Sequence, residues 1–538
     1  MRILLFFFIF SVLSSCNQSS DHKVVDEERI SITQGVVPDS TEALQMSGKA
    51  LAQAYCQACH TLPDPSLLDK ITWQKKVLPQ MALRLGLGSS NLNPFLGKST
   101  QEIYELLQAG IFPQQPYVSK ANWKKIEDYY VENAPEKLKM PKVAAAKPDS
   151  KNFRIVVPAL NKGKAALTTM VKYLPNAKEL WVGDMRNWIF RLNQQLQVTD
   201  SMVLDTPPVD MVKGKQAYKV LTIGSIIPSD KGEGQIDEFW NTAGKTTLMQ
   251  PLLKGLRRPV NVVEADLNQD NVPDLVVCNY GYNLGSLVWY QGLGKGKYKL
   301  NTLKNLPGSR KVEVMDLNKD GLPDIVAMFA QGTETIKVFY NQGSGKFKEE
   351  NLVQLPPVYG LIYFELADFN NDGSPDIILA NGDNADYSPI LKPYHGIRIY
   401  LNDKQNKFSA AYFYPMPGAT KAIARDFDQD GDLDIAAISY FPDFEAAPKS
   451  GFLYLQQTNK MRFQATTFKQ TQLGRWFTMD AGDYDQDGDE DIILGSFTNA
   501  LTPAPAALQK QWVKEGPSVI VLQNTKNVKN QNVASADK

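Results

Sequence analysis

The residues Cys56-Gln57-Ala58-Cys59-His60 form a C-x-x-C-H motif, the stretch of this chain with the most evident chemistry. Two thiols at this spacing can add to the two vinyl groups of a haem, and the imidazole that follows can ligate the iron. A redox-active cysteine pair and half of a zinc site are the alternatives. The chain has only four cysteines and three histidines, so no second cluster can complete a zinc tetrahedron. We therefore predict covalent haem, with thioether bonds at Cys56 and Cys59 and with His60 as the proximal iron ligand.

Five near-copies of an aspartate-rich segment carry a second candidate chemistry. They read DLNQDNVPD from Asp266, DLNKDGLPD from Asp316, DFNNDGSPD from Asp368, DFDQDGDLD from Asp426 and DYDQDGDED from Asp483. Positions one, three, five and nine carry side-chain oxygens, position seven can offer its backbone carbonyl, and glycine at position six allows a tight turn. This set of hard oxygen ligands suits calcium, and without a cation the packed carboxylates would repel one another.

These segments differ from EF-hand loops, because their twelfth position is always apolar and never glutamate. The first copy has Asn271 where the others have glycine, which weakens that site without removing it, since asparagine tolerates a positive φ. We predict structural calcium held by these side chains: Asp266, Asn268, Asp270, Asp274, Asp316, Asn318, Asp320, Asp324, Asp368, Asn370, Asp372, Asp376, Asp426, Asp428, Asp430, Asp434, Asp483, Asp485, Asp487 and Asp491.

The N-terminus indicates export and lipidation. After Met1-Arg2 comes an apolar run, residues 3–12, which is too short to span a bilayer and is typical of a signal peptide. The run leads into Leu13-Ser14-Ser15-Cys16, which resembles the bacterial lipoprotein signal, in which the cysteine becomes the acylated first residue. An ordinary signal peptide with an accidental cysteine is the alternative. The resemblance implies a lipid anchor at Cys16 in a bacterial cell envelope, at the outer membrane, on its periplasmic or surface face.

The motif must be positioned by helices, which the pattern predicts from about residue 41 to 135. The helical signals are an apolar face that leads into the motif, a capping box, and an aromatic repeat in the last segment. They comprise, in turn, Leu44, Gly48, Leu51 and Tyr55, then Ser99 to Glu102, then Trp123, Ile126 and Tyr130. A helix ending at C-x-x-C-H and an aromatic closing helix resemble the small helical cytochrome c domain, whose specific part here is the five-residue motif.

A second axial ligand of the iron is expected from a methionine. The remaining histidines, His22 and His395, lie far from the motif, so bis-histidine ligation is poorly supported. Met81 lies between the motif and the closing helix, where cytochromes c of this resemblance place their ligating methionine. A thioether ligand favours ferrous iron and raises the reduction potential, which suits electron transfer. Without it, an open iron could bind small ligands or perform peroxidase-like chemistry.

The aspartate loops must be positioned by strands. They start 50, 52, 58 and 57 residues apart, a period typical of propeller blades. Each loop lies between two strands, and the first four copies continue through a variable loop into a third strand and an aromatic fourth one. Residues 153–257 lack these loops but hold strand pairs that suit two further blades. We predict about seven four-stranded blades, with residues 153–157 supplying the missing strand of the last blade and closing the ring.

The loops resemble the FG-GAP/VCBS repeat family, whose propellers include the integrin α-subunit head. We thus predict a multidomain protein, with an all-α cytochrome c domain followed by an all-β propeller. The predicted parts are a signal peptide (1–15), a tether (16–40), the haem domain (41–135), a linker (136–152), the propeller (153–525) and a polar tail (526–538). Cys278, in an apolar run, is expected in the core.

One face of the propeller is a candidate binding surface. The variable loops, which lie on the face away from the calcium loops, gather aromatic residues, and Arg258 and Arg475 precede the first strands of their blades on that face. Such groups suit partner binding, and packing between neighbouring loops is the alternative. The aromatic and histidine residues concerned are Tyr280, Tyr282, Tyr387, Tyr394, His395, Tyr440, Phe441, Phe444 and Trp512.

These patterns together predict electron transfer by a membrane-anchored c-type cytochrome, whose calcium-stabilised propeller docks a redox partner protein or a surface assembly. Two alternatives stay open: a haem-linked oxidoreductase that binds substrate on its propeller, and a carbohydrate- or surface-binding lipoprotein. No dinucleotide fingerprint and no tryptophan-rich quinoprotein repeat supports an enzyme, and no catalytic residue is assigned. Acidic and basic residues balance at 58 each, which gives no indication of a nucleic-acid partner.

Overall fold

The computed structural model describes residues 41–88, 92–142, 146–148, 152–160, 164–214, 217–242, 245–385, 387–499 and 504–526. The predicted signal peptide, the tether with Cys16 and His22, and all but the first residue of the predicted tail lie outside these residues. Within the described part of the chain, no helix combines the length and the apolar character that a membrane crossing requires.

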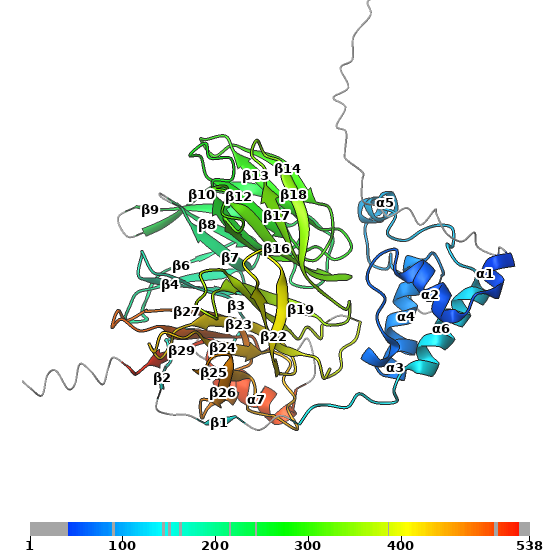
Figure 1. Cartoon of the computed structure of the whole chain (residues 1–538). Helices are drawn as coiled ribbons and strands as arrows, with labels where there is room; N and C mark the ends of the chain where they lie inside the picture. The colour runs from blue at the N-terminus through cyan, green and yellow to red at the C-terminus, as the bar shows by residue number, and fades with distance from the viewer. Residues whose placement is uncertain are drawn as a thin grey trace, which may run out of the picture.

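Six helices occupy residues 41–133, the helical segment, which lies beside a ring of strands (Figure 1). They are α1 (Thr41–Gln45), α2 (Gly48–Cys56), α3 (Lys70–Thr72), α4 (Leu78–Arg84), α5 (Thr100–Gln108) and α6 (Lys120–Asn133), with a 3-10 turn at Pro65–Leu67 and a π turn at Trp73–Val77. The capping box predicted at the start of α5 is present, because Ser99 and Glu102 exchange hydrogen bonds.

The stretch that leads into the motif forms two helices, because Ser47 caps α2 and separates it from α1. Leu51 and Tyr55 are buried as predicted, whereas Leu44 belongs to α1 and is 49% exposed. Gly48 allows α2 to pack closely against α6, since a Cβ at this position would lie 2.1 Å from the carbonyl oxygen of Lys125. The prediction of one continuous apolar face is therefore wrong at its first residue.

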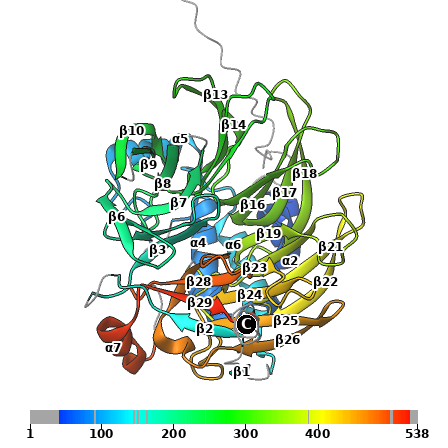
Figure 2. The same cartoon turned by 90° about the vertical axis from the view of Figure 1, so that its left-hand side faces the viewer.

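Seven sheets of four strands form the blades of a propeller, which Figure 2 shows face-on, with the helical segment behind it. Blade 1 has β3 (Thr168–Leu174), β4 (Glu179–Asp184), β5 (Trp188–Leu192) and β6 (Val198–Val203). Blade 2 has β7 (Pro208–Lys213), β8 (Ala217–Thr222), β9 (Gly234–Thr242) and β10 (Lys245–Leu256). Blade 3 has β11 (Pro259–Ala265), β12 (Asp274–Asn279), β13 (Ser286–Gly292) and β14 (Tyr298–Lys304).

Blades 4 to 7 complete the ring. Blade 4 has β15 (Ser309–Met315), β16 (Asp324–Gln331), β17 (Thr333–Asn341) and β18 (Phe347–Leu355). Blade 5 has β19 (Leu361–Ala367), β20 (Asp376–Asn381), β21 (Gly396–Asn402) and β22 (Phe408–Pro415). Blade 6 has β23 (Ala419–Arg425), β24 (Asp434–Ser439), β25 (Phe452–Asn459) and β26 (Arg462–Thr467). Blade 7 has β27 (Trp476–Gly482), β28 (Asp491–Ser496), β29 (Val519–Asn524) and β2 (Phe153–Val156).

The ring closes as predicted. β2 pairs antiparallel with β29, with Phe153 opposite Asn524 and Ile155 opposite Leu522, so blade 7 joins two distant parts of the chain. Two features were not predicted. The short strand β1 (Lys147–Pro148) adds to β26 in parallel, and helix α7 (Ala506–Glu515) is inserted between β28 and β29.

The core lies between the blades. The second strands β12, β20, β24 and β28 are buried along their whole length, because both of their faces are covered by neighbouring sheets. Cys278 is fully buried in β12, as expected of a small core residue. Each of the five aspartate loops connects the first strand of its blade to the second, so all five lie at one end of the ring.

Candidate functional site

The C-x-x-C-H motif lies at the C-terminal end of α2. Cys56 is the last residue of the helix, and the backbone N–H of Cys59 donates to the Cys56 carbonyl at 3.4 Å, which forms a turn. Both thiols are free. Burial raises the pKa of the Cys56 thiol to about 12, the reverse of the lowered pKa that activates redox cysteine pairs. This environment does not favour a thiol–disulfide exchange site.

The imidazole of His60 is held by a hydrogen bond to the backbone. Its Nδ1 lies 2.9 Å from the carbonyl oxygen of Thr61. Because a carbonyl can only accept, Nδ1 carries the proton and Nε2 keeps its lone pair. Burial lowers the pKa of His60 and so favours the neutral ring that a metal ligand must be. A backbone carbonyl on the other ring nitrogen is the usual support of a ligating histidine.

Met81 lies on α4 and is half-buried. It packs against the same apolar core as Cys56, a core that includes Trp73 and Tyr130 with their ring centroids 4.5 Å apart. The structure therefore brings Met81 and Cys56 to one apolar core. His395 lies elsewhere, fully buried in the connection between β20 and β21 of the propeller.

The helical segment is docked on the variable-loop face of the propeller. The Tyr394 hydroxyl donates to the Leu67 carbonyl at 2.9 Å, and Arg257 forms an ion pair with Glu105 of α5 at 2.9 Å. Three propeller side chains also pack against the core of the helical segment, namely Val358, Tyr387 and Ile390. The face predicted to meet a partner is thus used in part by the chain's own helices.

A buried carboxylate, Asp230 of blade 2, organises this contact. Its oxygens accept the backbone N–H groups of residues 282 to 284 and the side-chain amide of Asn283, and Lys98 of the helical segment lies 3.5 Å away. The side-chain Oδ1 of Asn283 in turn accepts a hydrogen bond from the guanidinium of Arg84 of α4 at 2.7 Å. Sequence reasoning missed Asp230, because a single aspartate in a polar loop carries no signal of its partners.

The other aromatic residues of this face pack between loops. Tyr440 is fully buried, and the Arg475 guanidinium lies 4.0 Å from its ring centroid. Trp512, on α7, is buried against Phe444. Arg258 lies 5.4 Å from the ring centroid of Tyr280. These side chains therefore pack between neighbouring loops, which is the alternative to partner binding that the sequence left open.

The aspartate loops share one geometry. In each loop the first aspartate accepts the backbone N–H groups of the fifth and sixth positions, as Asp316 does from Asp320 at 3.0 Å and from Gly321 at 2.9 Å. Asn271, which replaces this glycine in the first loop, adopts φ 65° and accommodates the same turn, as predicted. The loops are therefore folded alike from backbone hydrogen bonds.

The ninth aspartate has a second role that sequence reasoning missed. Asp324 is fully buried, and its carboxylate accepts from Leu317 in the loop at 3.0 Å and from Asn341 at the end of the third strand at 2.8 Å. The same pattern recurs at Asp274, Asp376 and Asp491, whereas Asp434 accepts from Gln457 of the third strand and from the Tyr454 hydroxyl. This carboxylate fastens the loop to the end of a neighbouring strand.

The last two loops bring carboxylates closest together. Oxygens of Asp426, Asp428 and Asp430 lie within 4.8 Å of one another, and so do those of Asp483, Asp485 and Asp491. The third-position aspartates each bind a glutamine through Oδ2, Gln456 for Asp428 and Gln523 for Asp485. Their Oδ1 atoms are buried without a hydrogen-bond partner among the described residues.

The charge of these two loops is poorly balanced. Burial, with a smaller contribution from neighbouring carboxylates, raises the pKa of Asp434 to about 7 and that of Asp491 to about 9. In the first three loops the third position is asparagine instead of aspartate, and Asn268 and Asn318 donate to the fifth-position carboxylates at 2.8 and 2.9 Å. The loops at Asp426 and Asp483 thus carry the least balanced negative charge of the five.

Comparison with known proteins identifies FG-GAP-like repeats at residues 266–327 and 316–379, and no curated protein matches the chain. Solved structures of similar architecture include the Neurospora crassa Pan2 WD40 domain, with 12% identity, coverage of 65% of this chain and 94% of that one, and a TM-score of 0.42. Saccharomyces cerevisiae Sqt1 shares 11% identity over 70% and 99% of the two chains, with a TM-score of 0.43. BBS1N in complex with ARL6DN shares 11% over 69% and 97%, with a TM-score of 0.42.

Proposed function

We propose that this protein is a membrane-anchored c-type cytochrome that transfers electrons, with its FG-GAP-repeat propeller as the docking scaffold. The observation that carries the proposal is the C-x-x-C-H motif at the end of α2, with free thiols and with Nε2 of His60 available to a metal. Cys56 and Cys59 would hold haem c through thioethers, and His60 and Met81 would ligate its iron. A bound haem supplies reversible one-electron chemistry.

The propeller contributes a rigid support. Contacts from Leu67, Arg84, Lys98 and Glu105 reach blades 2, 3 and 5 and the connection into blade 3, so the helical segment is held at several separate points. A redox partner bound to the propeller would therefore meet the motif in a constant orientation. The lipid anchor at Cys16 rests on the N-terminal sequence and would keep this assembly at an envelope membrane.

The visible spectrum of the purified protein, made in a host that matures cytochromes c, tests the proposal. We expect a covalent low-spin haem that does not react with carbon monoxide, because two protein ligands would occupy both axial positions. The variant Met81→Ala should bind carbon monoxide stoichiometrically and have a lower reduction potential.

Met46→Ala is the matched control, since Met46 contacts the same apolar core but precedes the motif. It should leave the spectrum unchanged. A wild-type haem that binds carbon monoxide readily would overturn the assignment of Met81 and favour catalysis or sensing. Wild-type protein without any covalent haem would overturn electron transfer itself.

We further propose that the aspartate loops bind calcium, most firmly at Asp426 and Asp483. Chelation should lower the melting temperature of the propeller on the order of 10 °C, since each occupied site adds a few kcal/mol. Asp428→Asn should reduce this response. Asp432→Asn should not, because it removes a charge from the same loop at the seventh position, where only the carbonyl is expected to ligate.

The destabilisation by chelation should also depend on pH. Without a cation, the raised pKa values of Asp434 and Asp491 favour the protonated forms of these two groups. Their contribution to the free energy of unfolding is therefore fully present below about pH 4 and is lost as the pH rises toward 7 for Asp434 and toward 9 for Asp491. Chelation should therefore cost more at pH 8 than at pH 5. Equal melting temperatures with and without chelator at pH 8 would contradict calcium binding.

A further inference from the structure

The axis of the propeller is lined by charged side chains from the innermost strands. They include Lys172 of β3, Asp210 of β7, Lys311 and Glu313 of β15, Glu365 of β19, Lys421 of β23 and Asp480 of β27, and the neutral Tyr363 of β19 lies among them. Charged groups in the interior of a fold require partners, and the partners of the acidic and the basic groups differ here.

The carboxylates are used by the backbone. Asp480 accepts the N–H of Tyr173 at 2.7 Å, Asp210 that of Val262 at 3.1 Å, Glu313 that of Leu366 at 3.2 Å, and Glu365 that of Ala424 at 3.4 Å. Each of the four bonds runs to the first strand of the next blade around the ring. These acidic side chains therefore connect neighbouring blades. Since their oxygens already accept backbone N–H groups, they are less available to neutralise lysines.

Lys421 is left without an acceptor. Among the described residues its ammonium forms no ion pair or hydrogen bond, and its Nζ lies 4.9 Å from the centroid of the Tyr363 ring. Burial lowers the pKa of Lys421 to about 8; Asp480 of blade 7 and Glu365 of blade 5 oppose this shift, and Lys172 of blade 1 and Lys311 of blade 4 add to it. A side chain of blade 6 can face four other blades only at the axis of the ring.

Two further donors surround the same space. The Lys311 ammonium lies 4.8 Å from the Tyr363 ring centroid, and it also pairs with Glu313. The Tyr363 hydroxyl likewise forms no hydrogen bond with the residues that the structure describes, and both Tyr363 and Lys421 are only half-buried, so that solvent reaches this space. Two ammonium groups and one hydroxyl therefore meet around one ring, with a deficit of acceptors.

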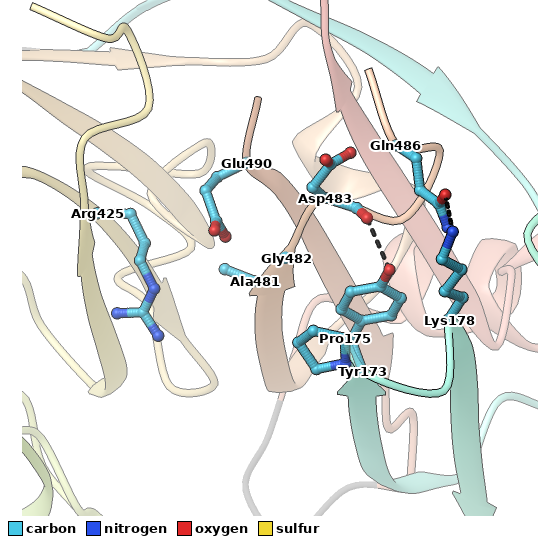
Figure 3. A pocket seen from close by; sticks show the side chains of 9 residues that line it. All are labelled: Tyr173, Pro175, Lys178, Arg425, Ala481, Gly482, Asp483, Gln486 and Glu490. Atoms are coloured by element: carbon cyan, nitrogen blue, oxygen red, sulfur yellow. Dashed lines mark hydrogen bonds between the residues drawn. The ribbon is translucent and has the colours of Figure 1, made fainter. Parts of the chain in front are cut away.

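A pocket of about 320 Å³ lies at the end of the ring that carries the aspartate loops (Figure 3). Its walls come from blades 1, 6 and 7, and they carry Arg425, Glu490, Lys178 and Tyr173. Arg425 forms an ion pair with Glu365, which places one pocket residue directly beside the charged lining of the axis. Gly482 is required in the wall, because a Cβ there would lie 2.3 Å from the Tyr173 ring.

We propose that the axis of the propeller binds a small oxyanion, such as inorganic phosphate, sulfate or a small carboxylate, between Lys421, Lys311 and the Tyr363 hydroxyl, with access through the pocket at Arg425. An anion supplies the acceptors that Lys421 and Tyr363 lack, and it neutralises a costly interior charge. A cation is disfavoured, because the carboxylates near this point already accept backbone N–H groups. The site does not depend on the haem, and it opens at the end of the ring opposite the helical segment.

Sulfate is the probe for this site, because phosphate would precipitate with calcium. Calorimetric titration of the full-length protein with sodium sulfate should show saturable binding. Lys421→Met should weaken that binding at least about tenfold, and Tyr363→Phe by about tenfold, the loss expected for one hydrogen bond to a charged group. Lys299→Met is the matched control, because Lys299 is exposed on β14, far from the axis, and its binding should equal wild type.

Thermal unfolding in sulfate and in chloride at equal ionic strength gives a second readout. Sulfate stabilises any folded protein by exclusion, so only the part of the shift that Lys421→Met loses reports the site. In chloride, Lys421→Met should be at least as stable as wild type, since the substitution removes an unpaired charge. If Lys421→Met does not fold, the variant Lys421→Gln is used in its place. The absence of saturable sulfate binding to wild type, or equal binding to wild type and Lys421→Met, overturns the proposal.

Discussion

Protein in which both motif cysteines are replaced, Cys56→Ser with Cys59→Ser, will carry no haem that survives denaturing electrophoresis, whereas wild type will retain it in full. The reason is chemical: thioether bonds persist when the chain unfolds, but bonds from His60 or Met81 to iron depend on the folded chain. Haem staining of gels, with the mass of the intact polypeptide, measures the difference directly. Each single variant should keep one thioether and bind less haem than wild type.

Cys278→Ser is the matched control for this experiment. It removes a thiol that is fully buried in β12 of the propeller, far in sequence from the motif, and it should leave haem content unchanged. Covalent haem on the double variant would contradict the assignment of the thioethers. A reversible disulfide between Cys56 and Cys59 in haem-free wild type would instead favour a redox pair.

Asp324→Ala will destabilise the propeller by roughly 3 to 6 kcal/mol, even when calcium has been removed. The Asp324 carboxylate accepts backbone N–H groups from Leu317, Asn318 and Asn341, and each buried donor left unpaired costs about 1–3 kcal/mol. Urea unfolding in the presence of chelator is the appropriate measurement, because the loss of a cation is then common to both proteins.

Asp320→Ala separates this effect from calcium binding. Asp320 is exposed at the fifth position of the same loop, and in chelator its removal should cost less than about 1 kcal/mol. With calcium present, both variants should lose stability. If Asp324→Ala and Asp320→Ala lowered the free energy of unfolding equally little in chelator, the ninth aspartate would be a cation ligand only. Its hydrogen bonds to the loop and to the third strand would then contribute little to stability.

The propeller was predictable because its information is repeated. Five copies of one loop, each between two apolar strands, predict the blades, and the missing fourth strand after Val519 predicts that residues near Phe153 close the ring. A local motif likewise suffices to propose roles for Cys56, Cys59 and His60, since the proposal rests on their spacing alone. The role of Met81 is harder to propose from sequence, because ligation depends on tertiary placement that no local pattern encodes.

The docking of the helical segment could not be predicted. It rests on Arg84, Lys98 and Asp230, which are common residue types in ordinary polar stretches, and their meaning comes from which distant residue each one meets. The prediction that Leu44 belongs to the apolar face of α2 was wrong for a related reason. The apolar spacing continued through Ser47, but the capping hydrogen bond from Ala50 to that serine ended one helix and began another.

The closure of blade 7 by β2 and β29 also sets an order of assembly. A ribosome makes β2 early and β29 last among the described strands, so the ring stays open until β29 has been synthesised. The loops that contact the helical segment, on blades 2, 3 and 5, belong to that ring. We therefore expect the helical segment to dock late, which would leave the C-x-x-C-H motif accessible during synthesis to the enzymes that the proposed haem attachment requires.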